Sequence, residues 1–198
     1  MTGATKIRPD HKEILGLIEP GTTALDLGCG SGDLMELLTK QKNVKAVGVE
    51  IDEKAVHDTV EKGLSVFHGD IDSGLSDYRD KSFDYVILNQ SIQQVSHVEK
   101  VLEDALRVGK KVIIGVPNFA YYKSRFQLGV LGRTPITSNL PYQWYETPNV
   151  RSLTLSDFTG LCKKHGVKVL KKIFIGENKR VPFLPNLFAE TGIFLISR

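Results

Sequence analysis

The stretch "LDLGCGSGDL", residues 25–34, constrains the fold of this chain more than any other part of the sequence. An apolar run carries Asp26, then Gly28, Gly30 and Gly32 follow at alternate positions, and a second apolar run begins at Leu34. Glycine lets a backbone turn sharply and pass close to a ligand, because no Cβ stands in the way. A glycine-rich turn that opens a helix is typical of α/β folds that bind nucleotides.

Strand-like and helix-like segments alternate along the chain. Strands are expected at 23–28, 45–51, 64–70, 83–90, 110–116, 167–175 and 192–198. Helices are expected at 14–18, 33–41, 53–63, 97–108 and 155–166. The last two strands are joined by a stretch that we expect to be a loop without a helix.

This order predicts a three-layer α/β sandwich around a mostly parallel, doubly wound sheet of seven strands. Because no helix separates the last two strands, an antiparallel strand is expected at one edge of the sheet. A chain of 198 residues is large enough for one full core. We therefore predict a single domain over residues 1–198.

Acids at the ends of the predicted strands indicate what the loop binds. Glu50 ends the second strand, where it can accept hydrogen bonds from ribose hydroxyls, and Asp70 ends the third, where it can accept from the adenine amine. Asp33 stands where a dinucleotide fingerprint wants Gly or Ala, which counts against an NAD enzyme. No Lys-Ser/Thr follows the glycines, which excludes a P-loop. The alternative is that Asp26 only caps the loop and that the other two acids are solvated.

Composition excludes several classes of function. The chain has 26 Lys and Arg against 23 Asp and Glu, and no basic block, so nucleic-acid binding is not indicated. Cys29 and Cys162 make neither a metal-ligand spacing nor a disulfide framework, so we predict no metal and reduced thiols. The first residues, "MTGATKIRPD", lack an apolar signal core, and no apolar run is long enough to span a membrane. These features predict a cytoplasmic protein.

Residues 118–150 form an unusual insert between the fifth strand and the helix at 155–166. A segment this long without predicted structure is usually functional or disordered, and its aromatic content argues against disorder. We expect either a substrate lid or a partner-binding surface, since Tyr, Trp and Arg are enriched at binding hot spots. A locally packed loop with no external partner is the alternative. The aromatic residues are Phe119, Tyr121, Tyr122, Phe126, Tyr142, Trp144 and Tyr145, and the basic ones are Lys123, Arg125 and Arg133.

The sequence "DLGCGSG" resembles the loop D-x-G-x-G-x-G of class I S-adenosylmethionine-dependent methyltransferases, which have a Rossmann-like fold. That resemblance implies S-adenosylmethionine, or S-adenosylhomocysteine, as the cofactor. It places Asp26 and the three glycines at the methionine part, Glu50 at the ribose, and Asp70 with Ile71 at the adenine. Ile51 and Asn89 complete the implied binding residues. The segment "NQSIQQV" lacks the proline and aromatic residue of amine and nucleic-acid-base methyltransferases, which disfavours adenine or glutamine N-methylation.

A narrower resemblance covers nearly the whole chain. The segments "DYVILNQSIQQV", "LRVGKKVIIGVPNFAYYKSR", "LGRTPIT" and "LPYQWYETPNVRSLTLSDF" are similar to the MetW family of methionine-biosynthesis proteins. The resemblance implies a methyltransferase fold and an association with homoserine O-acyltransferase, whose activity the family is implicated in supporting. It implies no methyl acceptor.

Two functional hypotheses follow. In the first, the protein is a regulatory partner of homoserine O-acyltransferase, and its adenosyl pocket senses S-adenosylmethionine. In the second, it is a small-molecule methyltransferase. The sequence identifies no catalytic residue for the second hypothesis. The residues proposed to form the partner surface or to wall the acceptor site are Tyr121, Tyr122, Arg125, Trp144 and Tyr145.

Overall fold

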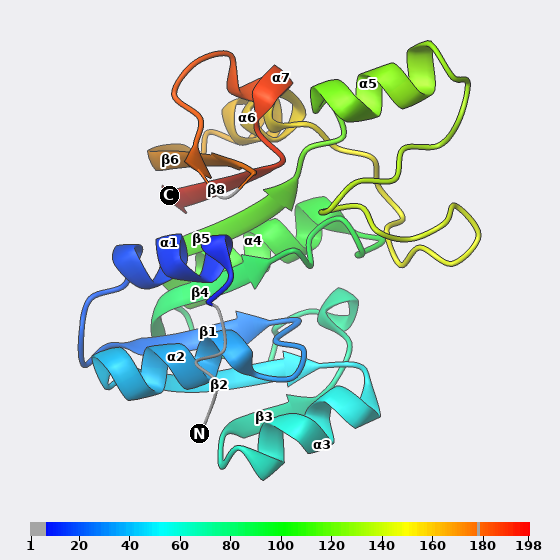
Figure 1. Ribbon diagram of the computed structural model, residues 1–198. Helices are drawn as coiled ribbons and strands as arrows, with labels where there is room; N and C mark the ends of the chain where they lie inside the picture. Colours follow the sequence, from blue (N-terminus) through cyan, green and yellow to red (C-terminus); the bar gives the residue numbers. More distant parts are fainter. Residues whose placement is uncertain (1–6, 178) are drawn as a thin grey trace.

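The computed structural model describes residues 7–177 and 179–198 (Figure 1). Residues 1–6, the first part of the segment "MTGATKIRPD" that was predicted to lack a signal core, lie outside the described residues. The strands are β1 (Thr23–Leu27), β2 (Lys45–Glu50), β3 (Ser65–His68), β4 (Phe83–Asn89), β5 (Gly109–Pro117), β6 (Lys168–Gly176), β7 (Lys179–Arg180) and β8 (Thr191–Ser197). The helices are α1 (Pro9–Leu17), α2 (Asp33–Lys42), α3 (Glu53–Glu61), the 3-10 turn η1 (Ile71–Ser73), α4 (Val98–Val108), α5 (Tyr122–Gly129), α6 (Leu155–Lys164) and α7 (Pro185–Phe188).

Within the described residues one eight-stranded sheet has the order β3-β2-β1-β4-β5-β8-β6-β7. The first five strands run parallel, with Leu25 of β1 facing Val47 of β2 and Val86 of β4. β8 runs antiparallel to both β5 and β6. The mostly parallel sheet with an antiparallel strand toward one edge is therefore confirmed. Two details differ from prediction: the short strand β7 is an eighth strand, and α7 lies in the stretch expected to contain no helix.

Helices cover both faces of the sheet, as the three-layer prediction requires. Ile14 and Ile18 at the first helix and Leu34 and Leu38 of α2 join one buried cluster with β4, β5 and β8 residues. Leu102 and the other apolar side chains of α4 join a second cluster with α6. Figure 1 shows α1 and α2 on the near side, with α4 behind the strands. The helical apolar period of α4, expected from the sequence, thus faces the core.

The insert 118–150 is an ordered excursion with its own helix, α5. Its base is closed by a hydrogen bond from Phe119 N to Leu153 O of 3.1 Å. Two side-chain hydrogen bonds join the middle of the insert to residues at the start of β8. Ser138 Oγ donates to Glu190 Oε1 at 2.7 Å, and Asn139 Nδ2 donates to Thr191 Oγ1 at 2.9 Å. These bonds hold the insert over the start of β8.

The carboxyl ends of β1, β2 and β4 point to one side of the molecule, and the insert lies at that side (Figure 1). This is the edge at which doubly wound sheets bind ligands. Among the described residues, none of the helices has the length and apolar character needed to cross a bilayer.

Candidate functional site

The glycine loop follows β1 and is folded back against the end of β2. The amides of Gly28 and Cys29 donate to Val49 O at 2.8 and 3.2 Å. Gly28 has φ of +78°, and a Cβ there would lie 2.8 Å from the Cβ of Ser91, so both the turn and the close packing require glycine. At Gly30, φ is +55° and a Cβ would meet no atom within 4 Å, so its Cα faces open space.

Two cavities meet at this loop. The larger, of about 500 Å³, contains the predicted ribose and adenine residues; the smaller, of about 180 Å³, contains the predicted methionine-end residues. Gly28 and Gly30 line both, so the backbone of the loop is their common wall. The larger cavity is lined by Gly28, Gly30, Val49, Glu50, Ile51, Asp52, Ala55, Gly69, Asp70, Ile71, Asp72, Gln90, Ser91, Gln94, Val95 and Pro148. The smaller is lined by Arg8, His11, Asp26, Gly28, Cys29, Gly30, Ser31, Asp33, Leu34 and Asn89.

Gly32 is the predicted cofactor-binding residue that lines neither cavity. It is buried at the start of α2, where a Cβ would lie 3.0 Å from side-chain atoms of Thr59 and Leu64. Gly32 therefore allows α2 to pack closely against its neighbours, and its place at the methionine part of a cofactor stays a prediction.

Glu50 holds the loop and the larger cavity together. Its Oε2 accepts from Gly30 N at 2.8 Å, and its Oε1 accepts from Ile51 N at 2.8 Å and from Asp52 N at 3.0 Å. The side chain is only 9% exposed, so these three amides are the compensation for burying its charge. Because a carboxylate has about four lone-pair positions, it can still accept from a ligand hydroxyl.

Asp26 occupies the floor of the smaller cavity and is 3% exposed. Burial, with a smaller contribution from repulsion by Glu50, raises the pKa of its carboxyl to about 7. A cationic ligand group beside Asp26 would remove much of this penalty, since an opposite charge favours the ionised carboxylate. The smaller cavity is thus suited to an ammonium group.

The remaining predicted residues divide between the two cavities. Asp70 is exposed and uses Oδ1 to accept from Asp72 N at 2.8 Å, which caps η1. Ile51 and Ile71 give the larger cavity an apolar surface. Asn89 donates to Asp10 Oδ2 at 2.9 Å, while its buried Oδ1 has no hydrogen-bond partner among the described residues.

Sequence reasoning missed the first turn of α1, which closes the smaller cavity. Arg8 donates to Asp10 at 3.1 and 2.6 Å, and both Arg8 and His11 line the cavity. Burial lowers the pKa of His11, which favours the neutral imidazole. No local pattern marks these residues, because only the packing of α1 across the sheet brings them to the glycine loop.

The insert residues separate into buried and exposed groups. Tyr121 is 2% exposed, and its ring packs edge-on against Tyr122 with the ring centroids 4.6 Å apart, so its side chain anchors the insert; its role at a partner or acceptor surface stays a prediction. Trp144 and Tyr145 are 70% and 65% exposed. Their rings pack against each other with centroids 5.6 Å apart. None of these four lines either cavity, whereas Pro148 lines the larger one. Arg125 is also exposed.

On α3, outside both cavities, His57, Asp58 and Glu61 place potential metal-ligand atoms within 4.8 Å of one another. The sequence predicts no metal, and acidic helix surfaces of this kind occur commonly without an ion.

The comparison with protein families matches nearly the whole chain. The family described as "Methionine biosynthesis protein MetW" matches residues 8–196. The bifunctional methionine biosynthesis protein MetXA/MetW of Rhodopirellula baltica is 33% identical over 96% of this chain, which spans 32% of that relative's length. The demethylmenaquinone methyltransferase of Oceanobacillus iheyensis is 26% identical over 80% of this chain and 69% of its own length.

Solved structures show the same fold. An S-adenosylmethionine-dependent methyltransferase from Archaeoglobus fulgidus superposes with a TM-score of 0.71 at 15% identity, covering 96% of this chain and 91% of its own. A second one, from Aquifex aeolicus, gives a TM-score of 0.64 at 17% identity, covering 96% and 90%. At such identities the likeness concerns the class I methyltransferase fold alone.

Proposed function

The chain belongs to the MetW family of methionine biosynthesis proteins, and on that premise we propose that it binds S-adenosylmethionine and acts as a regulatory partner of homoserine O-acyltransferase. The proposal rests on the position of the insert. An exposed aromatic surface lies on the same insert whose Pro148 lines the larger nucleoside-sized cavity. One segment therefore serves both a partner surface and a ligand site.

The two cavities match the two ends of S-adenosylmethionine. The larger, of about 500 Å³, lies within the range of cofactor pockets and offers Glu50 to a ribose and Asp70 to an exocyclic amine. The smaller offers both signs of charge that a free amino-acid end requires: Asp26 for the ammonium and Arg8 for the carboxylate. When bound, the cofactor supplies an activated methyl group on its sulfonium.

The partner surface is the exposed apolar part of the insert. Trp144 and Tyr145 are the large aromatic side chains of the type that dominates binding hot spots. The exposed side chains of α5 and the turn after it extend the apolar area: Phe126, Leu128, Val130 and Leu131. The relative from Rhodopirellula baltica joins MetXA and MetW in one bifunctional chain, which supports an association between the two.

Regulation requires that the ligand distinguish free protein from complex. S-adenosylmethionine shifts the acyltransferase only if it binds the two forms with different affinity. Pro148, together with hydrogen bonds from the amides of Val150 and Arg151 to Gln93 O at 3.1 and 3.0 Å, links the insert to the loop that lines the cavity. Equal affinity for the free and bound protein would disprove the sensing step.

A second candidate, a small-molecule methyltransferase, is favoured by one observation. A third cavity of about 270 Å³ adjoins the smaller one through Asp10, which is hydrogen-bonded to Asn89. Ser138 and Asn139 of the insert line it, and its volume has room for a small acceptor. Transfer of labelled methyl from S-adenosylmethionine to a metabolite in cell extract would establish this activity.

The deciding experiment measures homoserine O-acyltransferase activity of the cognate enzyme, alone and with equimolar protein. We expect a rise in activity and co-elution of the two chains. Trp144→Ala should weaken both effects while retaining S-adenosylmethionine binding. Absence of both effects with the intact protein would refute the partner role and leave the methyltransferase as the working function. We place either function in the cytoplasm, because Cys29 and Cys162 are both free thiols.

A further inference from the structure

The third cavity, of about 270 Å³, is lined by residues at the start of α1, in the insert and at the start of β8. Three carboxylates and one ammonium group are among the side chains that line it. Whether the protein itself supplies a positive charge for each carboxylate decides what kind of ligand the cavity can bind.

Two of the three carboxylates already have a positive partner. Asp10 is paired with Arg8, whose Nη2 lies 2.6 Å from its Oδ2. Glu177 is paired with Lys123, whose Nζ lies 2.7 Å from its Oε1. The negative charges of these two acids are therefore compensated within the protein.

The third carboxylate, that of Glu190, has no such partner. The residue is 9% exposed and forms no ion pair with a Lys, Arg or His among the described residues. Ser138 Oγ donates to its Oε1 at 2.7 Å, and the amide of Glu177 donates to its Oε2 at 3.3 Å. These neutral donors leave the charge itself uncompensated, although buried charges in proteins are normally paired. Because a carboxylate has about four lone-pair positions, Glu190 can still accept from a ligand.

Thr191, the next residue along β8, offers an unused donor to the same cavity. It is 4% exposed, and its Oγ1 accepts from Asn139 Nδ2 at 2.9 Å but donates to no acceptor in the part of the chain that the structure describes. Buried polar groups are normally hydrogen-bonded, so this hydroxyl favours a ligand oxygen. Neighbouring residues of the cavity wall therefore present one uncompensated negative charge and one free neutral donor.

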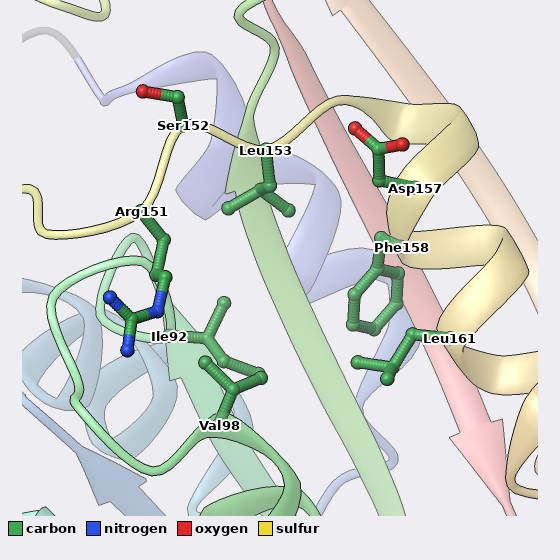
Figure 2. A pocket seen from close by; sticks show the side chains of 8 residues that line it. All are labelled: Ile92, Val98, Arg151, Ser152, Leu153, Asp157, Phe158 and Leu161. Atoms are coloured by element: carbon green, nitrogen blue, oxygen red, sulfur yellow. The ribbon is translucent and has the colours of Figure 1, made fainter.

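The cavity of about 300 Å³ between the loop after β4 and α6 lacks this arrangement (Figure 2). Its charged side chains, Arg151 and Asp157, are exposed, lie on opposite sides and point away from its interior. Apolar side chains, among them Ile92, Leu153 and Phe158, line that interior. It therefore favours an uncharged apolar group, in contrast to the third cavity.

We propose that the third cavity binds a small amine that carries a hydroxyl or carbonyl oxygen. The ammonium group pairs with the carboxylate of Glu190, and the oxygen accepts from the hydroxyl of Thr191. A cavity of about 270 Å³ lies at the small end of ligand pockets, so it suits such an amine better than a nucleotide. The inference depends neither on the proposed acyltransferase partner nor on methyl transfer.

The test is a chemical-shift titration of the full, isotopically labelled chain with 4-aminobutan-1-ol. We expect saturable shifts in the amide signals of Ser138, Asn139 and Thr191, which line the cavity.

Three matched probes divide this ligand into its parts. Butane-1,4-diol replaces the ammonium group by a hydroxyl and should bind about tenfold more weakly or worse, because a charge-assisted hydrogen bond is lost. Butylamine lacks the oxygen and should bind about threefold more weakly, because a neutral hydrogen bond is lost. The anion 4-hydroxybutanoate should not bind in this cavity.

Two variants locate the two contacts. Glu190→Gln keeps an oxygen for Ser138 but removes the charge, and it should weaken binding of 4-aminobutan-1-ol about tenfold or more. Thr191→Val keeps the shape of the side chain without its hydroxyl, and it should lower the affinity for 4-aminobutan-1-ol to that for butylamine. Glu146→Gln makes the same change as the first variant at an exposed acid of the insert that lines none of these cavities, and it should leave binding unchanged.

The proposal is overturned if 4-aminobutan-1-ol does not bind, or if butane-1,4-diol binds equally well, as an apolar cavity would allow. It is also overturned if the shifts centre on Gly28 and Gly30, which would place the amine beside Asp26 in the smaller cavity. Normal binding by folded Glu190→Gln would overturn it as well. The matched probes test the charge on the original chain, so the result stands even where a variant loses its fold.

Discussion

The Asp26→Asn variant is expected to gain stability at alkaline pH while losing affinity for S-adenosylmethionine. The carboxyl is 3% exposed, and burial together with repulsion from Glu50 raises its pKa from an ordinary 3.8 to about 7. Between these two values the folded protein holds a proton that the unfolded chain has released. The free energy of unfolding therefore falls as the pH rises through this window.

The magnitude follows from the width of the window. Each pH unit within it is worth about 1.4 kcal/mol, so between pH 5 and pH 8 this group removes about 3 kcal/mol from the stability of the ligand-free protein. Asparagine does not titrate, so the variant should gain about 3 kcal/mol relative to the original protein across the same range. At about 2–4 °C per kcal/mol for a chain of this size, the relative gain in Tm is about 6–12 °C.

Two assays check the two halves of this prediction. Thermal unfolding of the ligand-free proteins, followed by circular dichroism from pH 5 to pH 8, gives the stability difference. Calorimetric titration at pH 8 gives the affinity, which should fall about 10- to 100-fold, since a charge-assisted contact is worth about 1.5–3 kcal/mol. Parallel stability profiles for the variant and the original protein would refute the assignment of a buried, destabilising charge to Asp26.

Asp33→Asn is the matched control, because Asp33 lines the same cavity. A hydrogen bond from Lys62 lowers the pKa of Asp33, the opposite direction from Asp26. Its contribution is present above the ordinary pKa and is lost as the pH falls, so this variant should be slightly less stable at neutral pH. A gain in stability at pH 8 from both changes would show a general charge effect.

Three further predictions test the site and the insert. Glu50→Ala should weaken S-adenosylmethionine binding by about 1.5–3 kcal/mol and lower Tm, since three amides lose their acceptor; an unchanged calorimetric affinity would remove Glu50 from the ribose. Trp144→Ala should weaken the acyltransferase complex by about 2 kcal/mol in titration without changing Tm, whereas Tyr121→Ala should lower stability by about 3–5 kcal/mol in denaturant unfolding; the reverse pattern would exchange their roles. Gly28→Ala should destabilise through its φ of +78° and its contact with Ser91, and adding Ser91→Gly should restore only part of the loss; full recovery of Tm would mean that the backbone is unstrained there.

Local patterns predicted most of the architecture. Buried strands such as β4 and the amphipathic α4 follow directly from apolar content and period, and their order predicts the parallel sheet. The helix α5 escaped prediction because among its eight residues only Ser124 is buried, so it has no apolar stripe. β7 and α7 are two and four residues long, too short to show a period.

In the candidate site, too, some residues could be predicted from local sequence patterns and others could not. That Asp26, Glu50 and Asp70 lie at one edge of the sheet was predictable, because each is at or within two residues of the carboxyl end of a strand and parallel strands bring these ends together. Arg8 and His11 were not, because they reach the loop only through the packing of α1. Nor does composition distinguish Tyr121, which is buried, from Trp144, which is exposed; the difference arises from the surroundings that each meets in the folded insert.

The hydrogen bond between Phe119 and Leu153 at the base of the insert has an evolutionary consequence. Because the chain leaves and returns at neighbouring points, changes of length in the excursion alter loop-closure entropy only slowly and leave the strand registers intact. Selection can then act on its exposed tip separately from the sheet that carries it. Related chains can therefore change the exposed tip of the insert while the cavities at the glycine loop stay as they are.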